Sequence, residues 1–335
     1  MKVLHVPFCF HPDSIGGTEI YVEALARNLP SLGIQTLIAA PWDREAVYEY
    51  EGLRVRRYPV SPQVRDLRDL YGEGDESASQ DFARILDEER PDIVHLHAFT
   101  RGVSLCMVRE TKRRGIPVVF TYHTPTVSCQ RGTLMRWGRE VCDGVLDVRR
   151  CTACTLHGLR VPKLFAQGLA HVPTRLGRIL GSLRLTGGVW TALRMTELVQ
   201  RRHAAFHALM DEVDCVVVLC RWTRDVLLCN GVPPEKIVLC RHGLLSPTEK
   251  VANAPTIRNP QSEIRNPTVL RLAFLGRLDP TKGPDLLIRA VQAVPNLPVE
   301  LHIYGIAQGE GAVQYCRHLK ALAGDDRRIA FREPV

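Results

Sequence analysis

The chain has 335 residues, of which 45% are hydrophobic and 24% charged, a balance typical of folded proteins and a length typical of two domains. No stretch of about 18 apolar residues is free of charge, and the N-terminus lacks the pattern of a secretory signal, so we expect a cytoplasmic protein without a membrane-spanning helix. The net charge of +8 suits an anionic partner such as nucleotide phosphates, an anionic membrane face or a nucleic acid. In the cytoplasm, the 11 cysteines favour thiols over a disulfide framework.

Residues 1–245 alternate between strand-like and helix-like segments. Val3–Phe8 is a predicted strand and Thr18–Leu32 a predicted helix, whereas the polar stretch that ends at Gly74 is predicted to be irregular. Near-continuous apolar strands separated by amphipathic helices indicate a parallel sheet covered on both faces. The later segments are the predicted strands Ile34–Ala39, Asp92–His97, Pro117–Tyr122, Val213–Cys220 and Ile237–Cys240 and the predicted helices Asp81–Arg90, Gly102–Arg114 and Thr223–Asn230.

Residues 125–205 interrupt this alternation and are predicted to be an insertion, whose first part carries four closely spaced cysteines. Cys129, Cys142, Cys151 and Cys154 are separated by twelve, eight and two residues. Four thiolates complete a tetrahedral zinc site, and an iron–sulfur cluster uses the same number of ligands. The alternative is a set of reduced, unligated thiols in a surface lobe. A metal here would have a structural role, and the remaining seven cysteines are predicted to pack in apolar cores.

The second part of the insertion, Leu159–Arg202, is strongly basic. It carries eight Arg or Lys residues against the single acid Glu197, and these alternate with Leu, Ile, Val and Trp190. A basic amphipathic helix can lie on an anionic bilayer, which would place the protein at the inner face of the membrane. Solvated arginines on ordinary surface helices explain the pattern equally well, and glycines interrupt a single long helix.

A linker is predicted at residues 246–269, followed by a partial second domain at 270–335. The linker is polar and repeats Ile257-Arg258-Asn259-Pro260 as Ile264-Arg265-Asn266-Pro267, which indicates a tolerated insertion. The segment after it is predicted to form a second β-α-β-α-β run. Its predicted elements are Leu270–Leu275, Asp285–Val294, Val299–Tyr304, Ala312–Ala323 and Ile329–Phe331.

Each domain contains a strand, a glycine turn and a helix start, the geometry that directs backbone N–H groups at an anion. In the first, Gly16 and Gly17 allow close backbone approach and positive φ angles. A plain tight turn explains these two glycines equally well. In the second, Arg277 and Lys282 flank a turn held by Pro280, so both cations can point at one diphosphate. We expect the two turns to face each other across a cleft.

Four motifs together resemble the family 4 glycosyltransferases of the GT-B fold. They are Gly16-Gly17-Thr18-Glu19, Pro91-Asp92-Ile93-Val94-His95-Leu96-His97, Thr121-Tyr122-His123-Thr124 and Gly276-Arg277-Leu278-Asp279-Pro280-Thr281-Lys282-Gly283. The resemblance implies two Rossmann-like domains, the first on the acceptor side and the second binding the nucleotide sugar. It further implies transfer of the sugar to a saccharide or lipid-linked acceptor with retained configuration, without a catalytic metal.

The same resemblance implies roles for individual residues. Gly16 and Gly17 would lie beside the donor diphosphate, Arg277 and Lys282 would hold it as it leaves, and Gly305 would lie near the nucleotide. His123 matches a histidine near the transferred sugar, with a core histidine as the alternative. His95 and His97 share one strand face by the period of two, and His97 is predicted either to line the site or to pack.

One departure from the family pattern matters. The family carries two glutamates separated by seven residues, downstream of the Arg/Lys loop, and no such pair follows Gly305. We therefore expect a truncated family member, and a catalytically inactive nucleotide-sugar-binding remnant stays open as the alternative. A nucleic-acid-binding protein is disfavoured because aromatic residues are not interleaved with the basic ones.

Overall fold

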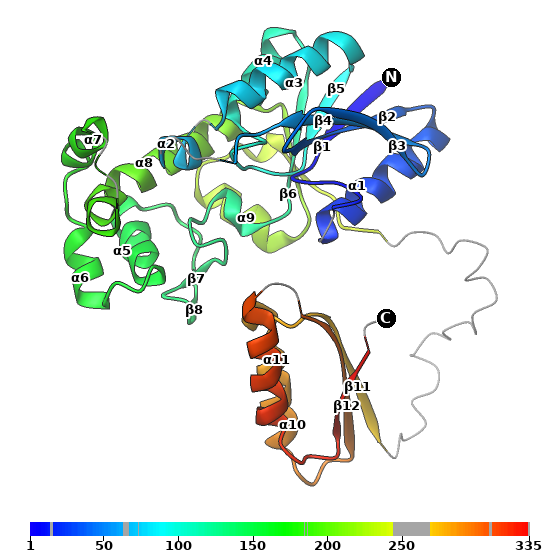
Figure 1. Ribbon diagram of the computed structural model, residues 1–335, viewed down its shortest axis with the longest axis vertical. Coiled ribbons are helices and arrows are strands. Elements are labelled where there is room, and N and C mark those ends of the chain that lie inside the picture. The colour runs from blue at the N-terminus through cyan, green and yellow to red at the C-terminus, as the bar shows by residue number, and fades with distance from the viewer. Residues whose placement is uncertain are drawn as a thin grey trace. The chain divides into compact units, whose positions relative to one another are not determined.

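The computed structural model describes residues 1–13, 16–62, 67–72, 74–183, 185, 187–243, 269–307 and 310–333. The chain divides into two compact units, Met1–Leu245 and Ser246–Val335, and each is described here by itself (Figure 1). The repeated motif and nearly all of the predicted linker lie outside the described residues. Within the described residues, no helix has the length and apolar character needed to cross a bilayer.

The first unit is built on a sheet of eight strands, all parallel except for one antiparallel hairpin (Figure 1). The strand order is β10-β9-β6-β5-β1-β2-β4-β3. The strands are β1 (Lys2–Val6), β2 (Gln35–Trp42), β3 (Ala46–Tyr50), β4 (Leu53–Pro59), β5 (Ile93–Leu96), β6 (Val118–Tyr122), β9 (Cys215–Val218) and β10 (Ile237–Leu239).

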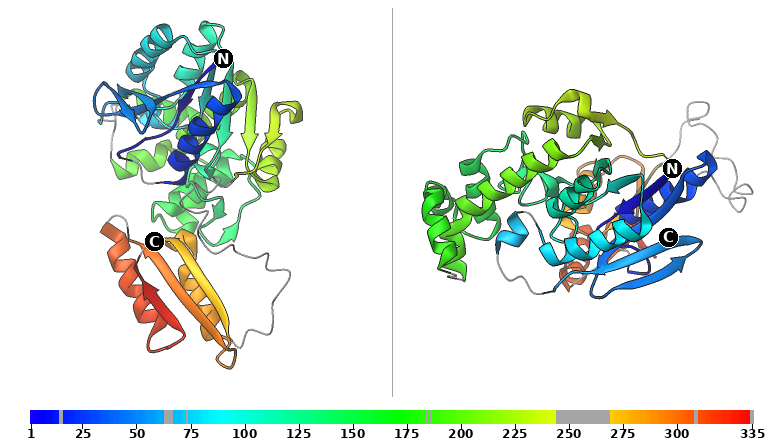
Figure 2. Two further views of the ribbon diagram at one scale, coloured as in Figure 1. Left: turned by 90° about the vertical axis from the view of Figure 1, so that its right-hand side faces the viewer. Right: turned by 90° about the horizontal axis from the view of Figure 1, so that it is seen from above.

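Helices cover both faces of this sheet (Figure 2). Helices α3 (Glu76–Glu89), α4 (Leu105–Arg113) and the second half of α8 (Gly188–Glu212) bury their apolar stripes in the main core, around Phe82, Met107 and Phe206. Helix α1 (Gly17–Asn28) covers the other face, where Val22 and Ala26 pack on Ile38 and Val55. Helix α9 (Arg221–Cys229) connects β9 to β10. Alternate residues of β2 therefore enter two different cores, as the period of two requires.

The strand order reverses between β1 and β5, and this reversal positions the site. From β1 the chain proceeds outward through β2 and β4, and then returns to place β5 on the other side of β1. Loops leaving β1 and β5 therefore diverge, which opens a crevice at the carboxyl ends of these two strands. In open parallel sheets, ligands bind in such a crevice.

The hairpin β3–β4 is absent from the sequence-based prediction, which treated this stretch as irregular. Two buried arginines on β4 explain the error, because charged residues at inward positions hide the alternation of a strand. Arg56 forms ion pairs with Glu88 and Glu89 at 2.7 and 3.0 Å. Arg57 is 1% exposed and donates hydrogen bonds to backbone carbonyls.

Residues 125–205 form a helical lobe and then rejoin the main unit. The hairpin β7 (Met135–Arg136) and β8 (Glu140–Val141) precedes α5 (Val148–Gly158), α6 (Lys163–Leu169) and α7 (Thr174–Ser182). These helices share a small core with the first half of α8, around Leu156, Met195 and Leu198. Although the sequence predicted an insertion up to residue 205, α8 is one continuous helix whose second half crosses from the lobe onto the sheet.

The prediction that all remaining cysteines pack in cores is wrong for Cys220, Cys229 and Cys240, which are exposed. Cys220 is the N-cap of α9, Cys229 is the last residue of α9, and Cys240 follows β10, the edge strand of the sheet. Apolar neighbours in sequence do not bury a residue at a sheet edge.

The second unit is a parallel sheet in the order β11-β12-β13. Its strands are β11 (Leu270–Arg277), β12 (Val299–Ile306) and β13 (Ile329–Arg332), and its helices are α10 (Pro284–Gln292) and α11 (Glu310–Ala323). Because the strand order does not reverse, right-handed crossovers place both helices on one face (Figure 1). Ile288, Leu301 and Leu319 form the centre of the resulting core.

Candidate functional site

The loop between β1 and α1 presents Gly16 and Gly17 at the carboxyl end of the sheet. Gly16 is the N-cap of α1, with an extended backbone (φ −143°) and no side-chain capping bond. The expectation of positive φ angles is wrong here, since neither glycine adopts one. Gly16 is needed for space instead, because a Cβ atom there would lie 3.0 Å from the carboxylate of Glu19, which is 4% exposed.

Gly17 has the opposite environment. A Cβ atom at Gly17 would meet no described atom within 4 Å, so the space beside the first helical residue is open. The first N–H groups of α1 carry the positive end of the helix dipole and have no capping side chain. This terminus can accept an anion.

Arg57 fixes the β1–α1 loop through hydrogen bonds, and no pattern in the sequence pointed to this role. Its Nη2 atom donates to the carbonyl oxygens of Phe10 and His11 at 2.5 and 3.1 Å, and its Nε donates to the Tyr48 hydroxyl at 3.0 Å. Tyr48 in turn donates to the carbonyl of His11. The glycine loop is therefore fixed by a buried guanidinium on β4.

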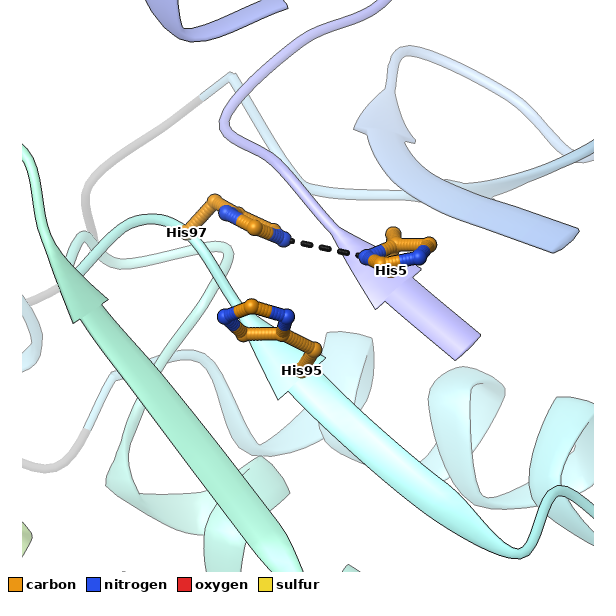
Figure 3. Close-up of side chains that lie close together, drawn as sticks. All are labelled: His5, His95 and His97. Carbon is orange, nitrogen blue, oxygen red and sulfur yellow. Dashed lines mark hydrogen bonds between the residues drawn. The ribbon is translucent and has the colours of Figure 1, made fainter. Parts of the chain in front are cut away.

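Three histidines form a hydrogen-bonded chain beside this loop. His5 on β1 lies 3.2 Å from His97, between Nδ1 and Nε2 respectively (Figure 3). The Nδ1 atom of His97 lies 3.1 Å from Nε2 of His123, which follows β6. His97 is only 2% exposed, so it meets the rim of the crevice through His123 and does not line the surface itself.

The three hydrogen-bonded histidines are electrically neutral at physiological pH. Burial lowers the pKa of His5 to about 4, and burial together with His242 lowers the pKa of His123 to about 4. Burial, reinforced by His95, His5 and His123, holds the pKa of His97 well below its ordinary value. Each ring therefore has one N–H donor and one acceptor nitrogen, and the tautomers of neighbours are coupled.

Two arrangements of the protons satisfy both hydrogen bonds. His5, at the buried end of the histidine row, selects between them. The Nε2 atom of His5 is buried without a partner among the described residues. An unpaired buried N–H is the costlier group, so we assign Nε2 of His5 as the bare acceptor. His5 then donates to His97, His97 donates to His123, and Nδ1 of His123 carries a proton. His123 thus offers a hydrogen-bond donor at the crevice.

His5, His95 and His97 are the one group of three potential metal ligands, in the part of the chain that the structure describes, with ligand atoms within 4.8 Å of one another (Figure 3). Four of their six nitrogens already make hydrogen bonds. Both nitrogens of His97 make hydrogen bonds, and Nε2 of His95 lies 2.7 Å from the Thr121 hydroxyl. A metal would have to break these bonds, so we interpret the cluster as a hydrogen-bonded support for His123.

Two aromatic residues that the sequence did not single out complete the rim. Tyr21 on α1 stacks on His242, with ring centroids 4.5 Å apart, and meets the edge of His123 at 5.0 Å. His242 follows β10, so the last described segment of the unit returns to the crevice. These contacts place three aromatic rings from distant segments around one opening.

Arg202 joins the helical lobe to the site. Its Nη2 atom donates to the carbonyl oxygens of Phe99 and Thr126 at 3.3 and 2.6 Å, and its guanidinium covers the Phe99 ring at 4.4 Å. Burial lowers the pKa of Arg202 to about 10, which leaves it charged at neutral pH. This residue of α8 therefore fixes the loops that follow His97 and His123.

In the second unit, Arg277 ends β11 and Lys282 ends the short 3-10 turn that follows. Both residues are exposed, and neither side chain has a hydrogen bond or ion pair to any described residue. The turn is held by backbone bonds, with the amide of Lys282 donating to the carbonyl of Asp279 at 2.9 Å. Two unpaired cations on one rigid turn can bind a diphosphate.

Gly305 lies beside Gly276 in the register of β12 and β11. A Cβ atom at Gly305 would lie 2.2 Å from the side chain of Leu278, which is buried. The glycine therefore has a packing reason of its own: it lets Leu278 close the turn that carries Arg277 and Lys282.

A cavity elsewhere in the first unit does not contain the predicted residues. Its volume is about 800 Å³, and its lining includes Ser61, Asp75, Arg101 and Arg109 between α3 and α4. Arg101 is already paired with Asp75 at 2.7 Å. We place the site at the reversal of strand order instead, because the glycine loop and the histidine chain meet there.

Comparisons with known proteins identify the family of this chain. The family model described as a glycosyl transferase 4-like domain matches residues 16–243. The D-inositol 3-phosphate glycosyltransferase of Corynebacterium glutamicum (strain R) is 24% identical over 332 residues, which are 95% of this chain and 65% of that protein. The chain thus spans just under two thirds of the length of this relative.

Solved structures share the fold. The sucrose-phosphate synthase of Thermosynechococcus elongatus superposes with a TM-score of 0.55 at 14% identity, covering 100% of this chain and 71% of that one. Anabaena HepE in complex with UDP and glucose has a TM-score of 0.51 at 14% identity. The match covers 99% of this chain and 70% of that one. At these identities the likeness concerns the fold.

Proposed function

Because this chain belongs to the family of glycosyl transferase 4-like proteins, with the α/β architecture of the GT-B fold, we propose that it transfers a sugar from a nucleotide-sugar donor to an acceptor hydroxyl with retained configuration. The observation that carries the proposal is the ring contact between Tyr21, in the helix that Gly17 begins, and His123 at the end of β6, with centroids 5.0 Å apart. One loop offers an uncapped helix terminus for phosphate, and the other offers a neutral hydrogen-bond donor for a sugar hydroxyl.

The proposed reaction breaks the bond between the anomeric carbon and the diphosphate oxygen. Arg277 and Lys282 neutralise the negative charge that develops on the departing diphosphate. The acceptor oxygen bonds to the anomeric carbon on the face that the diphosphate leaves, and its proton passes to the diphosphate. Charge neutralisation by these side chains makes a catalytic metal unnecessary in this proposal. The remaining contribution is positioning, to which His123 and the glycine loop belong.

Two observations support a nucleotide donor: the cations on the turn of the second unit and the ligand of a protein with a similar fold. Anabaena HepE is described in complex with UDP and glucose, and the turn of Arg277 and Lys282 has two cations without protein partners among the described residues. We therefore propose a nucleoside diphosphate sugar as donor and a saccharide or lipid-linked hydroxyl as acceptor.

The proposal is tested by incubating the intact protein with a panel of nucleoside diphosphate sugars and measuring release of the nucleotide. Release that depends on an added saccharide or lipid-linked acceptor supports transfer. Binding of a nucleotide sugar without any release would instead support the inactive, nucleotide-sugar-binding alternative. Absence of both binding and release would reject both.

A peripheral membrane contact is part of the same proposal, since exposed apolar side chains gather on two short helices. Leu164 and Phe165 on α6 are 81% and 70% exposed, and Ile179 on α7 is 57% exposed. Lys163 and Arg178 lie on the same helices and are exposed. Both helices lie at the lobe end of the first unit (Figure 1). Apolar and cationic side chains together suit an anionic bilayer surface.

Flotation with phosphatidylglycerol vesicles tests this contact. We expect binding that weakens with salt and is lost in Phe165→Ser, whereas Leu32→Ser, an exposed leucine far from the lobe in sequence, should bind as the parent does. Equal binding by both variants, or none by the parent, would contradict it.

A further inference from the structure

The small hairpin β7–β8 and the start of α5 enclose a pocket that the proposed reaction does not use. Its volume is about 40 Å³, and its lining includes Cys129, Cys142, Cys151 and Cys154. All four thiols are free and half-buried. The fold therefore gathers into one pocket residues that are up to 25 positions apart in the sequence.

Three different local structures supply these thiols. Cys151 and Cys154 lie one turn apart on α5, so they share a face of the helix. Cys142 directly follows β8, and its amide donates to the carbonyl of Leu134 at 2.9 Å. Cys129 follows a 3-10 turn, and its amide donates to the carbonyl of Pro125 at 2.7 Å.

Two hydrogen-bond donors point at the sulfur of Cys154. The backbone N–H of Trp137, in the hairpin turn, donates to Sγ of Cys154 at 3.3 Å, and the Arg131 guanidinium approaches the same sulfur at 3.8 Å. Arg136 and Arg150 also line the pocket. Four thiolates and one divalent cation carry a net charge of −2, which Arg131 and Arg136 offset, whereas Arg150 is already ion-paired with Asp143 at 2.7 Å.

The segment also needs a cross-link, because it has almost no core of its own. Its two strands have two residues each. Between residues 125 and 147, all of them described, Val127 and Leu134 are the only buried apolar side chains. A metal cross-link would stabilise a segment with so little apolar burial of its own.

We infer that Cys129, Cys142, Cys151 and Cys154 bind one structural zinc ion as a tetrathiolate site that fixes the β7–β8 hairpin on α5. The thiols are spread more widely than the histidine group described above, so the ion must draw them together. The small pocket suits a single ion better than a cluster of four irons and four sulfides. With four protein ligands, no position stays open for substrate.

Binding must release protons. Zinc affinity should increase as the pH rises from 6 to 8, as for any site that displaces thiol protons.

Elemental analysis of the intact protein, purified without added metal, tests the inference. We expect about one zinc per chain, lost in Cys151→Ser and in Cys154→Ser but retained in Cys215→Ser, a half-buried cysteine on β9. Cobalt added to the stripped protein should give the intense thiolate-to-metal absorption of a tetrahedral site. Iron with acid-labile sulfide, a pair of disulfides by thiol counting, or no metal and no cobalt spectrum would overturn it.

A second measurement avoids variants that fail to fold. Chelation of zinc from the parent protein should lower its Tm and make the hairpin segment around Trp137 sensitive to protease, and added zinc should restore both. Unchanged Tm and protection after complete removal of the metal would overturn the structural role. These readouts do not involve sugar transfer, so they stand or fall independently of the proposed function.

Discussion

The Nδ1 atom of His97 lies 3.1 Å from the Nε2 atom of His123, and this contact joins a buried residue to the rim of the crevice. Because His97 also bonds to His5, the proton position on His123 is determined by a residue that no substrate touches. The crevice therefore receives a defined hydrogen-bond donor from a neutral imidazole.

Replacing His97 with phenylalanine tests this relay. The ring would still fill its place, but His123 would lose the bond that fixes its tautomer and orientation. We expect kcat to fall by about 10²-fold with little change in donor KM, since misorientation of a positioned group has this order of effect. The nitrogen chemical shifts of His123 should also change from one tautomer to a mixture.

The matched control is His203→Phe. His203 is a buried histidine on α8 that does not belong to the hydrogen-bonded row of His5, His97 and His123. It should leave both kcat and the His123 shifts as in the parent. Equal losses in the two variants would mean that any buried histidine is needed for folding, and the relay would have to be abandoned.

Acid should destabilise the fold well before the carboxylates titrate. The folded-state pKa values of His5 and His123 are about 4, below the unfolded value of about 6.5. Between these values the unfolded chain binds more protons, so the free energy of unfolding falls as the pH decreases from 6.5 to 4. Urea midpoints measured across this range should decline steadily, and His5→Gln should flatten the decline. A constant midpoint down to pH 4.5 would contradict the assignment of neutral buried rings.

The glycine loop makes a separate prediction. Gly17→Ala should leave Tm unchanged or slightly raised, because the new methyl group meets no described atom and alanine favours helix. If a donor phosphate approaches this position, KM for the donor should rise by about tenfold. Gly168→Ala, also a helical glycine with open space around it, should change neither quantity. Identical donor KM values in both variants would show that no ligand approaches Gly17.

The sequence predicted the alternating elements of both units well, because their strands and helices have clear apolar periods. It predicted the position of the glycine loop and identified His97 and His123 by resemblance. It could not identify His5, Tyr21 or His242 as their neighbours, since these residues meet only through strand order and register.

Other features were hidden for a different physical reason. Arg57 is charged yet buried, so the pattern around it indicated a surface loop and not an inner strand. Gly305 stays a prediction for nucleotide binding, and its contact with Leu278, which also requires a glycine there, could not be read from the sequence. A residue type alone does not reveal whether its neighbour is a ligand or a side chain.

The most direct measurement is turnover of a nucleotide-sugar donor by the double variant Arg277→Ala/Lys282→Ala. Arg271→Ala is the matched control, since it removes an exposed arginine from the other end of the same strand. We expect kcat of the double variant to fall by at least about 10²–10³-fold, because two cations would no longer stabilise the departing diphosphate, while circular dichroism and the control stay as in the parent. Turnover that survives in the double variant would contradict the proposed mechanism.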